Sequence, residues 1–582
     1  MNRFYLWLLV LGGFFVLTSH PLFSQSQPNV VLIITDDQGY GDLGYHGNPL
    51  IQTPVLDALA AESIRFTQFY VSPVCAPTRS SLMTGRYSLR TGVRDTYNGG
   101  AIMSPAEITL AEMLKAAGYR TGMFGKWHLG DSHPSRPIDQ GFEVSLMHNS
   151  GGMGQVGDVT TWFEGDRSYF DPVLWKNGKK KAYQGYCSDI FTDEALTFIE
   201  KNKDQPFFCY LSFNAPHTPL QLPEKYEAMY ADIAPEKALG EGYPVEMSER
   251  NKSDARKVYG MVSNIDDNVG RVLKQLEDLN LTRETIFIFL TDNGPQQARF
   301  NGGMHGRKGS VYEGGIRVPF FFRYPALFSG QRDISTAAAH YDLFPTLAEL
   351  CGGRLPRDRV IDGKSLVPLL SGQNVSWEER SMFHYWTRKY PERYRNMALR
   401  KGDFKLVAQT NYDAPLGDFE LYNLDIDPFE QQNLIKEQAE IGVALKIEMD
   451  QLHQALIRSP NLLQAPYISV GHPAENPVIL NRNDAGGARG IWSQEEVFGT
   501  WRVKVAPGRY SLRFKFVKDI PAGGTLYLET HTLVHTRKVD QATDLVEMKE
   551  VVLPAFEGEL IPFYRVGNQR IFPFWVEVEK VD

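Results

Sequence analysis

The feature that most constrains the fold is a regular alternation of short apolar runs with longer amphipathic segments across residues 28–345. Short apolar runs predict buried strands, and the segments between them predict helices. Because strands that alternate with helices pack into a sheet covered by helices, we expect an α/β fold with a mostly parallel sheet. Strands are predicted at 30–34, 119–124, 206–213 and 285–290, and helices at 54–66, 108–118 and 255–279.

The pattern changes twice beyond this region. From about residue 351 to 460, a few strands and a closing helix at 433–458 predict a smaller α+β subdomain. Short turn-separated strands then replace the helices and predict an extra all-β, sandwich-like domain. The predicted parts are a leader at 1–26, an α/β domain at 27–350, the α+β subdomain at 351–460 and the β domain at 461–582.

The first residues predict export. Arg3 precedes an almost entirely apolar run at 4–17, and small and polar residues follow at 24–27. This is the pattern of a secretory signal peptide, and the run is short for a membrane span. An uncleaved membrane anchor is the alternative interpretation. No membrane association is expected once the leader is removed.

Charge and cysteine content narrow the partners. The formal net charge of −8 argues against nucleic acid or an anionic membrane as the main partner. Four cysteines, at positions 75, 187, 209 and 351, are too few for a disulfide scaffold in 582 residues. If Cys75 is used chemically, at most one disulfide can form among the others.

Polar and charged side chains follow the ends of the predicted strands. In an open parallel sheet, ligands bind beyond the carboxyl ends of the strands, so these side chains are expected to meet along one edge. They are Asp36 and Asp37 after the first strand, Lys126 and His128 after the second, His217 after the third, and Asp292 and Asn293 after the fourth.

The acidic members of this set suit a metal ion. Asp36, Asp37, Asp292 and the amide of Asn293 are hard oxygen ligands, which Ca²⁺ or Mg²⁺ prefers. A lone Asp-Asp pair more often begins a solvated loop. We give a solvated or capping interpretation to the second such pair, at 266–267, because it lies in a predicted helix.

Cationic side chains are expected at the same edge. Arg79, Lys126 and Lys308 are positively charged, and His128 and His217 can share a proton. Taken singly, each is a surface charge or a satisfied core histidine. Together near a metal, they indicate an anionic substrate whose charge is balanced in the transition state.

Cys75 is the candidate nucleophile. It stands just before Pro77, which suits the first position of a helix that continues through Arg79. A helix N-terminus favours a negatively charged nucleophile, and Arg79 lies one turn further on. A reactive thiol and a buried thiol both remain open on these residues alone.

Two longer motifs carry a resemblance to a known family. Residues 73–85, PVCAPTRSSLMTG, and residues 118–128, GYRTGMFGKWH, resemble the two signatures of the formylglycine-dependent sulfatases. The resemblance spans about residues 28–435 and implies an alkaline-phosphatase-like fold. Shorter motifs resemble those of the family in the same order, namely ITDD at 34–37, APH at 215–217, TDNG at 291–294 and GRKGS at 306–310.

The resemblance implies a modified nucleophile and a metal. A separate maturation enzyme would oxidise Cys75 to formylglycine (3-oxoalanine), which is hydrated to a geminal diol. Ca²⁺, in preference to Mg²⁺, would be bound by the modified Cys75 together with Asp36, Asp37, Asp292 and Asn293.

The resemblance also implies a role for each cation. One hydroxyl of the modified Cys75, activated by Ca²⁺ and Arg79, would attack sulfur, and the second hydroxyl allows the covalent intermediate to break by elimination. His217, as general acid, and Lys308 would assist the departing alcohol. His128 would then take a proton from the second hydroxyl, and Lys126 would bind sulfate oxygens and hold the diol.

The expected substrate is a sulfated saccharide derived from a polysaccharide. Lys126, His217, Lys308 and His305 are predicted to bind it. Loops at 133–165, around His305 and at 384–394 are the predicted selectivity elements, because they are rich in Gly, His, Arg and aromatic residues. Resemblance to secreted polysaccharide-degrading sulfatases favours the periplasm or cell exterior over a lysosome.

Two other functions remain open at this point. A phosphodiester or phosphonate monoester hydrolase would use a similar metal site, and a glycan-binding protein would have lost the catalytic step. The C-terminal β domain is either a carbohydrate-binding module, suggested by Trp492, Trp501 and Trp575, or a structural lid. Aromatic residues in β domains more often belong to the core, which favours the lid.

Overall fold

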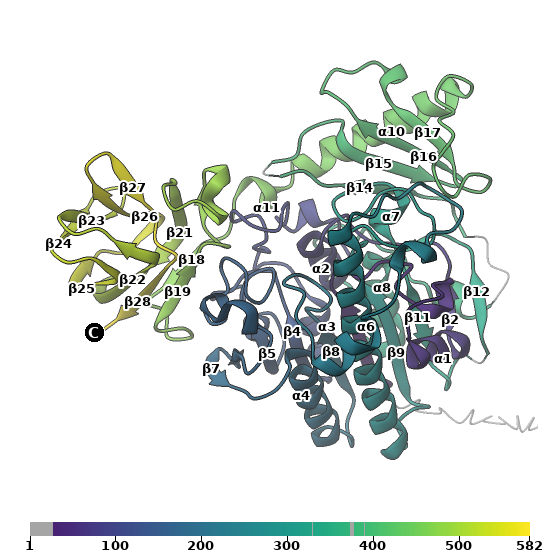
Figure 1. The fold of residues 1–582 in the computed structure, drawn as a ribbon, viewed down its shortest axis with the longest axis horizontal. Coiled ribbons are helices and arrows are strands. Elements are labelled where there is room, and N and C mark those ends of the chain that lie inside the picture. The colour runs from purple at the N-terminus through teal and green to yellow at the C-terminus, as the bar shows by residue number, and fades with distance from the viewer. Residues whose placement is uncertain (1–26, 329, 373–376, 389) are drawn as a thin grey trace, which may run out of the picture.

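The computed structural model describes residues 27–328, 330–372, 377–388 and 390–582, so the expected leader lies outside the described residues. A large α/β part lies beside a β lobe that ends at the C-terminus, and a smaller lobe that contains α10 lies above it (Figure 1). No helix in the described ranges combines the length and the apolar character needed to cross a membrane.

A ten-stranded sheet in the order β12-β2-β11-β9-β1-β8-β4-β5-β6-β7 forms the centre of the large part. The five strands from β9 to β5 are all parallel, which confirms the predicted α/β class. The strands are β1 (Asn29–Thr35), β2 (Ile64–Phe66), β4 (Arg120–Lys126), β5 (Val144–His148), β6 (Val173–Lys176), β7 (Lys179–Ala182), β8 (Phe207–Ser212), β9 (Thr285–Thr291), β11 (Phe320–Arg323) and β12 (Arg332–Ile334).

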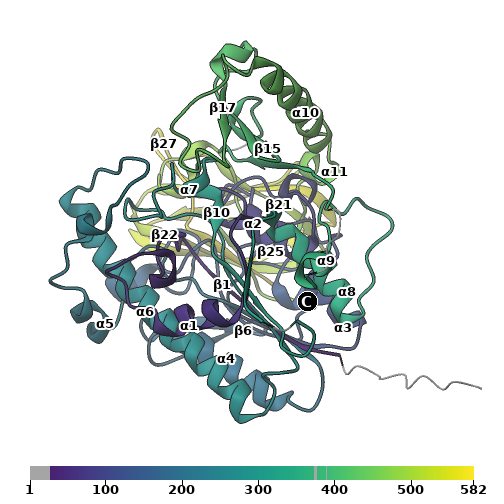
Figure 2. The same cartoon turned by 90° about the vertical axis from the view of Figure 1, so that its right-hand side faces the viewer.

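Helices cover both faces of this sheet. Successive side chains of a strand point to opposite faces, so Val30 and Leu32 of β1 pack into one hydrophobic cluster and Val31 and Ile33 into another. Figure 2 shows α1, α4 and α6 on one side and α3 and α8 on the other. The helices of this part are α1 (Pro54–Glu62), α2 (Cys75–Thr84), α3 (Leu110–Ala116), α4 (Cys187–Lys201), α5 (Glu224–Met229), α6 (Glu249–Asp278), α7 (Glu313–Ile316), α8 (Leu343–Cys351) and α9 (Val367–Leu370).

The helix predicted at 54–66 is too long. The helix ends at Glu62, and residues 64–66 form β2, which pairs with β11 and β12. Pairing with strands distant in sequence therefore overrides the helical pattern at this point. Conversely, α6 starts earlier than predicted because the Ser248 hydroxyl caps it by accepting a hydrogen bond from the Asn251 N–H.

The second Asp-Asp pair caps a neighbouring helix. Asp266 of α6 is buried and accepts hydrogen bonds from the N–H groups of Val55 (3.1 Å) and Leu56 (2.7 Å) in the first turn of α1. The carboxylate thus satisfies N–H groups that have no partner within their own helix. The capping interpretation is confirmed, although the capped helix is α1 rather than α6.

Two smaller sheets accompany the central one, in addition to those of the C-terminal lobe. In the small lobe, α10 (Ala439–Ile457) covers an antiparallel sheet, and it is shorter at its start than the predicted helix. That sheet consists of β14 (Ser381–Tyr385), β15 (Arg395–Lys401), β16 (Phe404–Gln409) and β17 (Glu420–Asn423). The large part also contains a short second sheet, which consists of β3 (Phe69–Tyr70), β10 (Arg317–Val318) and β13 (Ala338–Ala339).

The C-terminal lobe contains two further sheets around one hydrophobic cluster, preceded by α11 (Pro460–Leu463). Trp501 is fully buried in that cluster, as expected of a core residue. The first sheet holds β18 (Ile468–Val470), β20 (Gly486–Gly487), β21 (Gly499–Val505), β23 (Gly524–Glu529), β24 (Val534–Val539), β26 (Phe556–Val566) and β27 (Gln569–Ile571), and the second holds β19 (Val478–Asn481), β22 (Gly508–Ile520), β25 (Thr543–Leu553) and β28 (Trp575–Lys580).

Candidate active site

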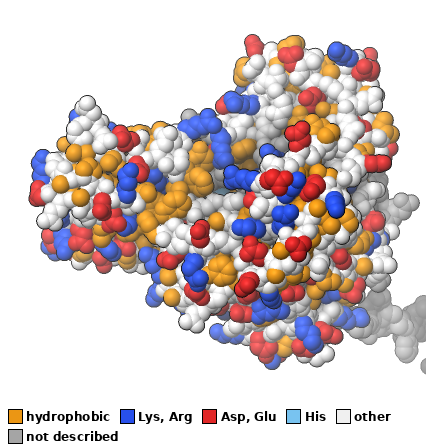
Figure 3. Space-filling view, viewed as in Figure 1, with side chains coloured by type: hydrophobic (Ala, Val, Ile, Leu, Met, Phe, Trp, Pro, Cys, Tyr) orange, Lys and Arg blue, Asp and Glu red, His pale blue; other side chains and the backbone are white. Residues whose placement is uncertain are grey.

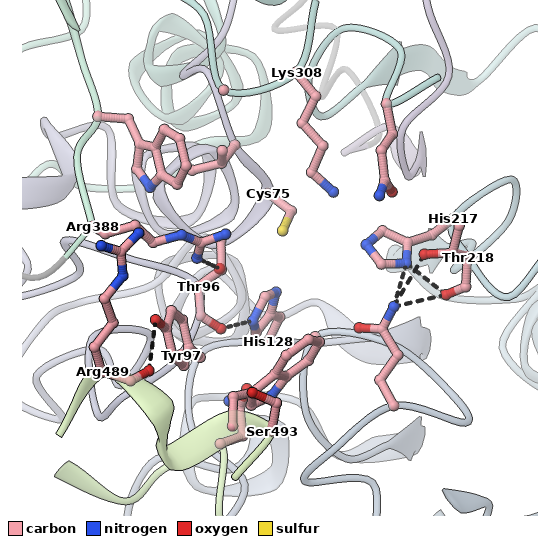
Figure 4. A pocket seen from close by; sticks show the side chains of 18 residues that line it. Cys75, Thr96, Tyr97, His128, His217, Thr218, Lys308, Arg388, Arg489 and Ser493 are labelled. Carbon is pink, nitrogen blue, oxygen red and sulfur yellow. Dashed lines mark hydrogen bonds between the residues drawn. The ribbon is translucent and has the colours of Figure 1, made fainter. Parts of the chain in front are cut away.

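A cavity of about 450 Å³ opens beyond the carboxyl ends of the central strands. Cys75, His128, His217 and Lys308, which four separate segments contribute, line it together (Figure 4). This convergence is what the strand-end argument predicts for an open parallel sheet. The volume lies within the range of small-molecule sites.

Cys75 is the first residue of α2 and is 2% exposed. Pro77 is therefore the third helical residue rather than the first, a position where the missing N–H costs nothing because first-turn N–H groups have no helical partner. Burial raises the pKa of the Cys75 thiol, although Lys126 and Lys308 oppose the rise. The unmodified side chain is thus a protonated thiol, which is a poor nucleophile.

The acidic cluster lies beside Cys75 at the ends of two paired strands. Thr35 of β1 lies opposite Thr291 of β9, so the residues that follow them are adjacent. The Asp37 N–H donates to Asp292 Oδ1 (3.2 Å), and the Asn293 amide donates to Asp37 Oδ1 (2.8 Å). Asp37 has a left-handed backbone with φ 62°, an uncommon conformation for a residue other than glycine.

Each carboxylate of the cluster faces a cation, so the cluster is close to neutral without a metal. Arg79, one turn into α2, is fully buried and also donates from Nη1 to the Lys126 carbonyl. The pairs are Arg79 with Asp292 at 2.8 Å, Lys308 with Asp37 at 2.6 Å, and Lys126 with Asp36.

The cations do not fully relieve the crowding of the carboxylates. Burial raises the pKa of Asp292 to about 7, and Asp36 adds to the rise while Arg79 opposes it. Burial would also raise the pKa of Asp37, but Lys308 beside it holds that pKa well below its usual range. A divalent cation is the ordinary way to stabilise carboxylates that are this close.

The donor atoms fit such a cation. Among the described residues, Asp36 Oδ1 and Asn293 Oδ1 are buried and have no hydrogen-bond partner. Ligand atoms of Asp36, Cys75 and Asp292 lie within 4.8 Å of one another. Hard oxygens dominate the set, as Ca²⁺ and Mg²⁺ require. A divalent cation would leave the neutral cluster positive, which suits an anionic substrate.

His128 presents a free nitrogen close to Cys75. The Thr96 carbonyl is 2.8 Å from His128 Nε2, and because a carbonyl only accepts, Nε2 carries the proton. Nδ1 is buried and has no hydrogen-bond partner in the described chain. Burial lowers the pKa of His128 well below its usual value, and Lys126 lowers it further. His128 is thus a neutral imidazole with a lone pair available to accept a proton.

His217 lies on the other side of the cavity, and it contacts a backbone carbonyl through Nδ1 rather than Nε2. Its Nδ1 lies 2.8 Å from the Thr218 carbonyl, to which it can donate, and 3.2 Å from the Gln155 amide nitrogen, and its Nε2 faces Asp37 Oδ2 at 3.5 Å. Burial lowers the pKa of His217 to about 3, and Lys308 contributes to that drop. An anionic substrate would raise this pKa and allow the imidazole to take up a proton.

One predicted site residue lies elsewhere. His305 is not among the described residues that line the cavity. Its ring is stacked between Tyr243 and Tyr312, with centroids 3.7 and 3.8 Å away. The other predicted residues all belong to the cavity or to the acidic cluster beside it.

Several lining residues were not predicted. The loops expected at 133–165 and 384–394 do contribute, through Gln155 and Arg388 for example. Tyr97 and Arg489 had no recognisable signal, because neither belongs to a motif or follows a predicted strand. Trp492 was noted only as a member of a carbohydrate-binding module, yet it lines the same cavity as Cys75.

The cysteines form no disulfide. All four are buried free thiols, so the one bridge that the sequence allowed is absent from the described residues. Cys209 lies in β8 and is fully buried, as expected of a small core residue.

Comparison with known proteins agrees with this geometry. The family model Sulfatase matches residues 28–353, and the model N-sulphoglucosamine sulphohydrolase, C-terminal, matches residues 303–456. Steryl-sulfatase from Homo sapiens is 30% identical over 446 residues, which cover 62% of this chain and 72% of that protein. N-acetylgalactosamine-6-sulfatase from Mus musculus is 32% identical over 388 residues, which cover 62% of this chain and 68% of that protein.

A solved structure has the same architecture. Ps i-CgsB in complex with k-i-k-neocarrahexaose superposes with a TM-score of 0.64 at 28% identity, over 75% of this chain and 94% of that one. The sheet and the acidic, cation-lined site define a hydrolase with the alkaline-phosphatase fold. Within that class, the chain belongs to the sulfatase family, as a type I sulfatase, and is a sulfuric ester hydrolase.

Proposed function

We propose that the protein removes sulfate from a sulfated saccharide with a formylglycine made from Cys75. The observation that carries this proposal is the position of Cys75 at a buried helix N-terminus, next to an acidic cluster that fits a divalent cation. Because burial keeps the thiol protonated, the residue needs chemical conversion to act as a nucleophile. A separate maturation enzyme would make that conversion.

Ca²⁺ is the cation that we propose for the site. Asp36, Asp37, Asp292 and Asn293 would hold it together with the modified Cys75, and the bound ion would supply positive charge next to the nucleophilic oxygen. The unpartnered oxygens of Asp36 and Asn293 support this assignment. Ca²⁺ is preferred over Mg²⁺ because a site made mostly of protein oxygens leaves little room for the water shell that Mg²⁺ retains.

The protein's own side chains divide the remaining work. Arg79 positions the nucleophile, since it is locked by Asp292 and by the Lys126 carbonyl. Lys126 and Lys308 both lower the pKa at Cys75, which places their charges where sulfate oxygens would bind. His217 would deliver a proton from Nε2 to the departing alcohol.

His128 would act at the other end of the reaction. Its free Nδ1 is the atom that would take the proton of the second hydroxyl while sulfate is expelled from the first and the aldehyde reforms. The hydrogen bond from Nε2 to Thr96 fixes the ring in that orientation. The two histidines therefore turn different ring nitrogens away from the backbone carbonyls that they contact, Nδ1 of His128 and Nε2 of His217.

A saccharide fits the cavity better than a flat apolar substrate. Its lining includes both aromatic side chains, among them Trp386 and Trp492, and polar ones such as Gln155 and Asn483. Aromatic faces with a few fixed polar groups are typical of sugar sites. The neighbour Ps i-CgsB was solved with an oligosaccharide, which supports the same substrate class.

We also propose a division of the chain and a location. Parts at 27–350, 351–460 and 461–582 each contain their own sheet, and separate hydrophobic clusters support the last two. The leader pattern at 1–26 supports export to the periplasm or cell exterior.

The test measures the modification of Cys75 and the release of sulfate in the same sample. Protein produced with its maturation enzyme is digested, and the Cys75 peptide is analysed by mass spectrometry while sulfate release is measured on a panel of sulfated mono- and oligosaccharides. We expect the aldehyde form and sulfate release in the same sample, and neither in Cys75→Ala. Active protein that contains only the thiol would refute the mechanism. A matched pair of substrates, an aryl sulfate and an aryl phosphodiester, is assayed alongside. Faster turnover of the phosphodiester would refute the proposed sulfatase function.

A further inference from the structure

The segment at 483–493 of the C-terminal β lobe reaches into the cavity that holds Cys75. It lies between β19 and β21 and includes β20, and Asn483, Arg489, Trp492 and Ser493 line the cavity. In Figure 4 this segment forms the wall below His128. The family models end at residue 456, so this wall lies outside the part of the chain that the family describes.

The segment is fixed in place by the α/β part rather than merely near it. The Trp492 indole donates to the Val156 carbonyl (2.9 Å), and the Gly99 N–H donates to the Asn483 carbonyl (3.2 Å). The Tyr97 hydroxyl donates to the Arg489 carbonyl (3.4 Å). These contacts position the segment before a ligand arrives, as a specific binding site requires.

The junction behind the segment is also well bonded. Asp131 Oδ2 accepts hydrogen bonds from the Ser150 N–H and the Asn481 amide, both at 2.8 Å. The Asp131 N–H donates to Asp484 Oδ2 (3.0 Å). All four residues are nearly or fully buried, so the β lobe cannot move away without exposing them.

The charge of the cavity wall is one-sided. Its described lining includes three cationic side chains, those of Lys308, Arg388 and Arg489, and no carboxylate. Lys308 is paired with Asp37 and Arg388 with Asp95. In the described chain, by contrast, no hydrogen bond, ion pair or ring contact engages the Arg489 guanidinium.

The two arginines lie away from the site of sulfate cleavage. Figure 4 shows Arg388 and Arg489 on the side of the cavity opposite His217, with Cys75 between them. Arg388 lies over the rings of Tyr97 (4.9 Å) and Trp386 (4.8 Å). Figure 3 shows Lys and Arg side chains gathered where the β lobe meets the rest of the molecule.

We propose that Arg489, together with Arg388, forms a second anion-binding subsite, so that the enzyme selects saccharides carrying another anionic group beside the sulfate that is removed. The inference rests on the proposed function, because it concerns the substrate of the same cavity. A guanidinium binds a carboxylate or a sulfate ester through paired hydrogen bonds, and Trp492 supplies an aromatic face for the sugar between the two anions. The β lobe thus contributes specificity-determining residues directly.

The experiment compares four substrates in the full-length, matured protein. Two are singly anionic, namely 4-nitrophenyl sulfate and a sulfated disaccharide with a neutral neighbouring sugar. Two are doubly anionic, namely the same disaccharide with a carboxylate on that sugar and the same disaccharide with a second sulfate on it. Arg489→Gln is expected to lower kcat/KM for the two doubly anionic forms roughly 10- to 100-fold, the size of a charge-assisted hydrogen bond. The loss on the two singly anionic substrates is expected to be at least about tenfold smaller.

Controls separate charge from folding. Arg513→Gln, on β22 of the same lobe and outside the cavity lining, should leave all four kcat/KM values unchanged. Arg489→Lys should restore part of the loss, because it returns the charge without the paired hydrogen bonds. An equal loss on all substrates, or no loss on the doubly anionic ones, overturns the subsite. The carboxylate and sulfate forms show which anion is preferred.

Binding keeps the two proposals distinguishable. The doubly anionic disaccharide is titrated calorimetrically into Cys75→Ala, with and without Arg489→Gln. A roughly 10- to 100-fold weaker Kd supports the subsite even if the wild-type protein releases no sulfate, an outcome that refutes only the proposed function. Equal affinities overturn the subsite even if sulfate release is normal.

Discussion

Asp36 and Asp37 are neighbours at the end of β1, yet their side chains meet different partners. Asp36 pairs with Lys126 and keeps one buried oxygen without a partner among the described residues, whereas Asp37 binds Lys308 and the Asn293 amide. At the scale of single residues, this division shows how two adjacent carboxylates could serve the proposed metal site while each holds a separate lysine.

The free oxygen of Asp36 gives a test of the metal. Saturation with Ca²⁺ at about 100 times Kd should stabilise chelator-treated protein by about 2.7 kcal/mol. Asp36→Asn removes one charged ligand, so the Ca²⁺-induced rise in Tm should largely disappear. Asp333→Asn, an exposed carboxylate outside the site, should keep the full rise. A normal Ca²⁺ response in Asp36→Asn would contradict the assignment.

Motifs predicted the positions of the candidate nucleophile, the acidic cluster and the two histidines because each lies near a strand end or a helix start. His305 shows where that reasoning stops. Its ring is stacked between Tyr243 and Tyr312, which are separated by almost seventy residues, and no local pattern announces that packing. A residue next to a motif is therefore placed by its packing partners rather than by the motif.

At the scale of elements, β4 and β8 carry Lys126 and Ser212 side by side, and Arg79 donates to both. Their close approach depends on Gly125, which has φ 116°. A Cβ at this position would lie 1.8 Å from the Ser212 carbonyl oxygen. The close packing of β4 against β8 therefore requires glycine at the first position of the GKWH motif, independently of the chemistry of Lys126 and His128.

Gly125→Ala is expected to reduce stability by roughly 2–4 kcal/mol and to displace Arg79, so that activity falls with it. Gly118→Ala is the matched control, because Gly118 also has a positive φ (97°) but no atom within 4 Å of the added Cβ. That variant should lose only about 1 kcal/mol. Equal losses of Tm in the two variants would show that backbone conformation, rather than the contact with Ser212, sets the cost.

The central strands β1, β4, β8 and β9 and the long helices α6 and α10 were predicted because their periodicity is sustained, whereas β5 and α4 were missed. The short strands β2 and β12 at one end of the sheet were missed, since three residues hold too little pattern and their pairing is distant in sequence. β26 was missed for another reason. It contains Pro562, which argues against a strand, yet that residue lies opposite Leu528 within the sheet.

At the scale of the whole molecule, the junction between the α/β part and the β lobe buries several acidic groups. Glu475 accepts a hydrogen bond from the His133 N–H (2.6 Å) and lies 3.6 Å from Arg136. Burial raises the pKa of Glu475 to about 7, although Arg136 opposes the rise. The folded protein therefore holds this proton at pH values where the unfolded chain has lost it.

The sign of the pH effect follows from that difference. Between pH 4.5 and about 7 Glu475 binds more proton in the folded state than in the unfolded state, so its contribution to stability falls as pH rises through this window. Glu475→Gln removes the effect, and its Tm relative to wild type should rise over the same window by the equivalent of roughly 1–3 kcal/mol. Glu557→Gln, a surface control, should follow wild type. A difference that does not change with pH would contradict the raised pKa.

The junction itself could not be predicted from the sequence. Tyr97, Arg388 and Arg489 meet at one cavity although about 390 residues separate the first from the last, and each is unremarkable in its own segment. The β domain was predicted as a fold, and both interpretations of its role, module or lid, treated it as separate from catalysis. What decides its role is the position of one short segment.

The placement of that segment has a consequence for synthesis. Translation delivers residues 75 to 308 long before residue 489, and domains fold as they emerge. A nascent chain can therefore form the part of the cavity that contains Cys75 and Lys308 before the segment at 483–493 has been synthesised. The residues proposed to cleave sulfate are therefore synthesised before those proposed to select the substrate. A chain that ends after the small lobe is expected to discriminate less between substrates than the full-length enzyme.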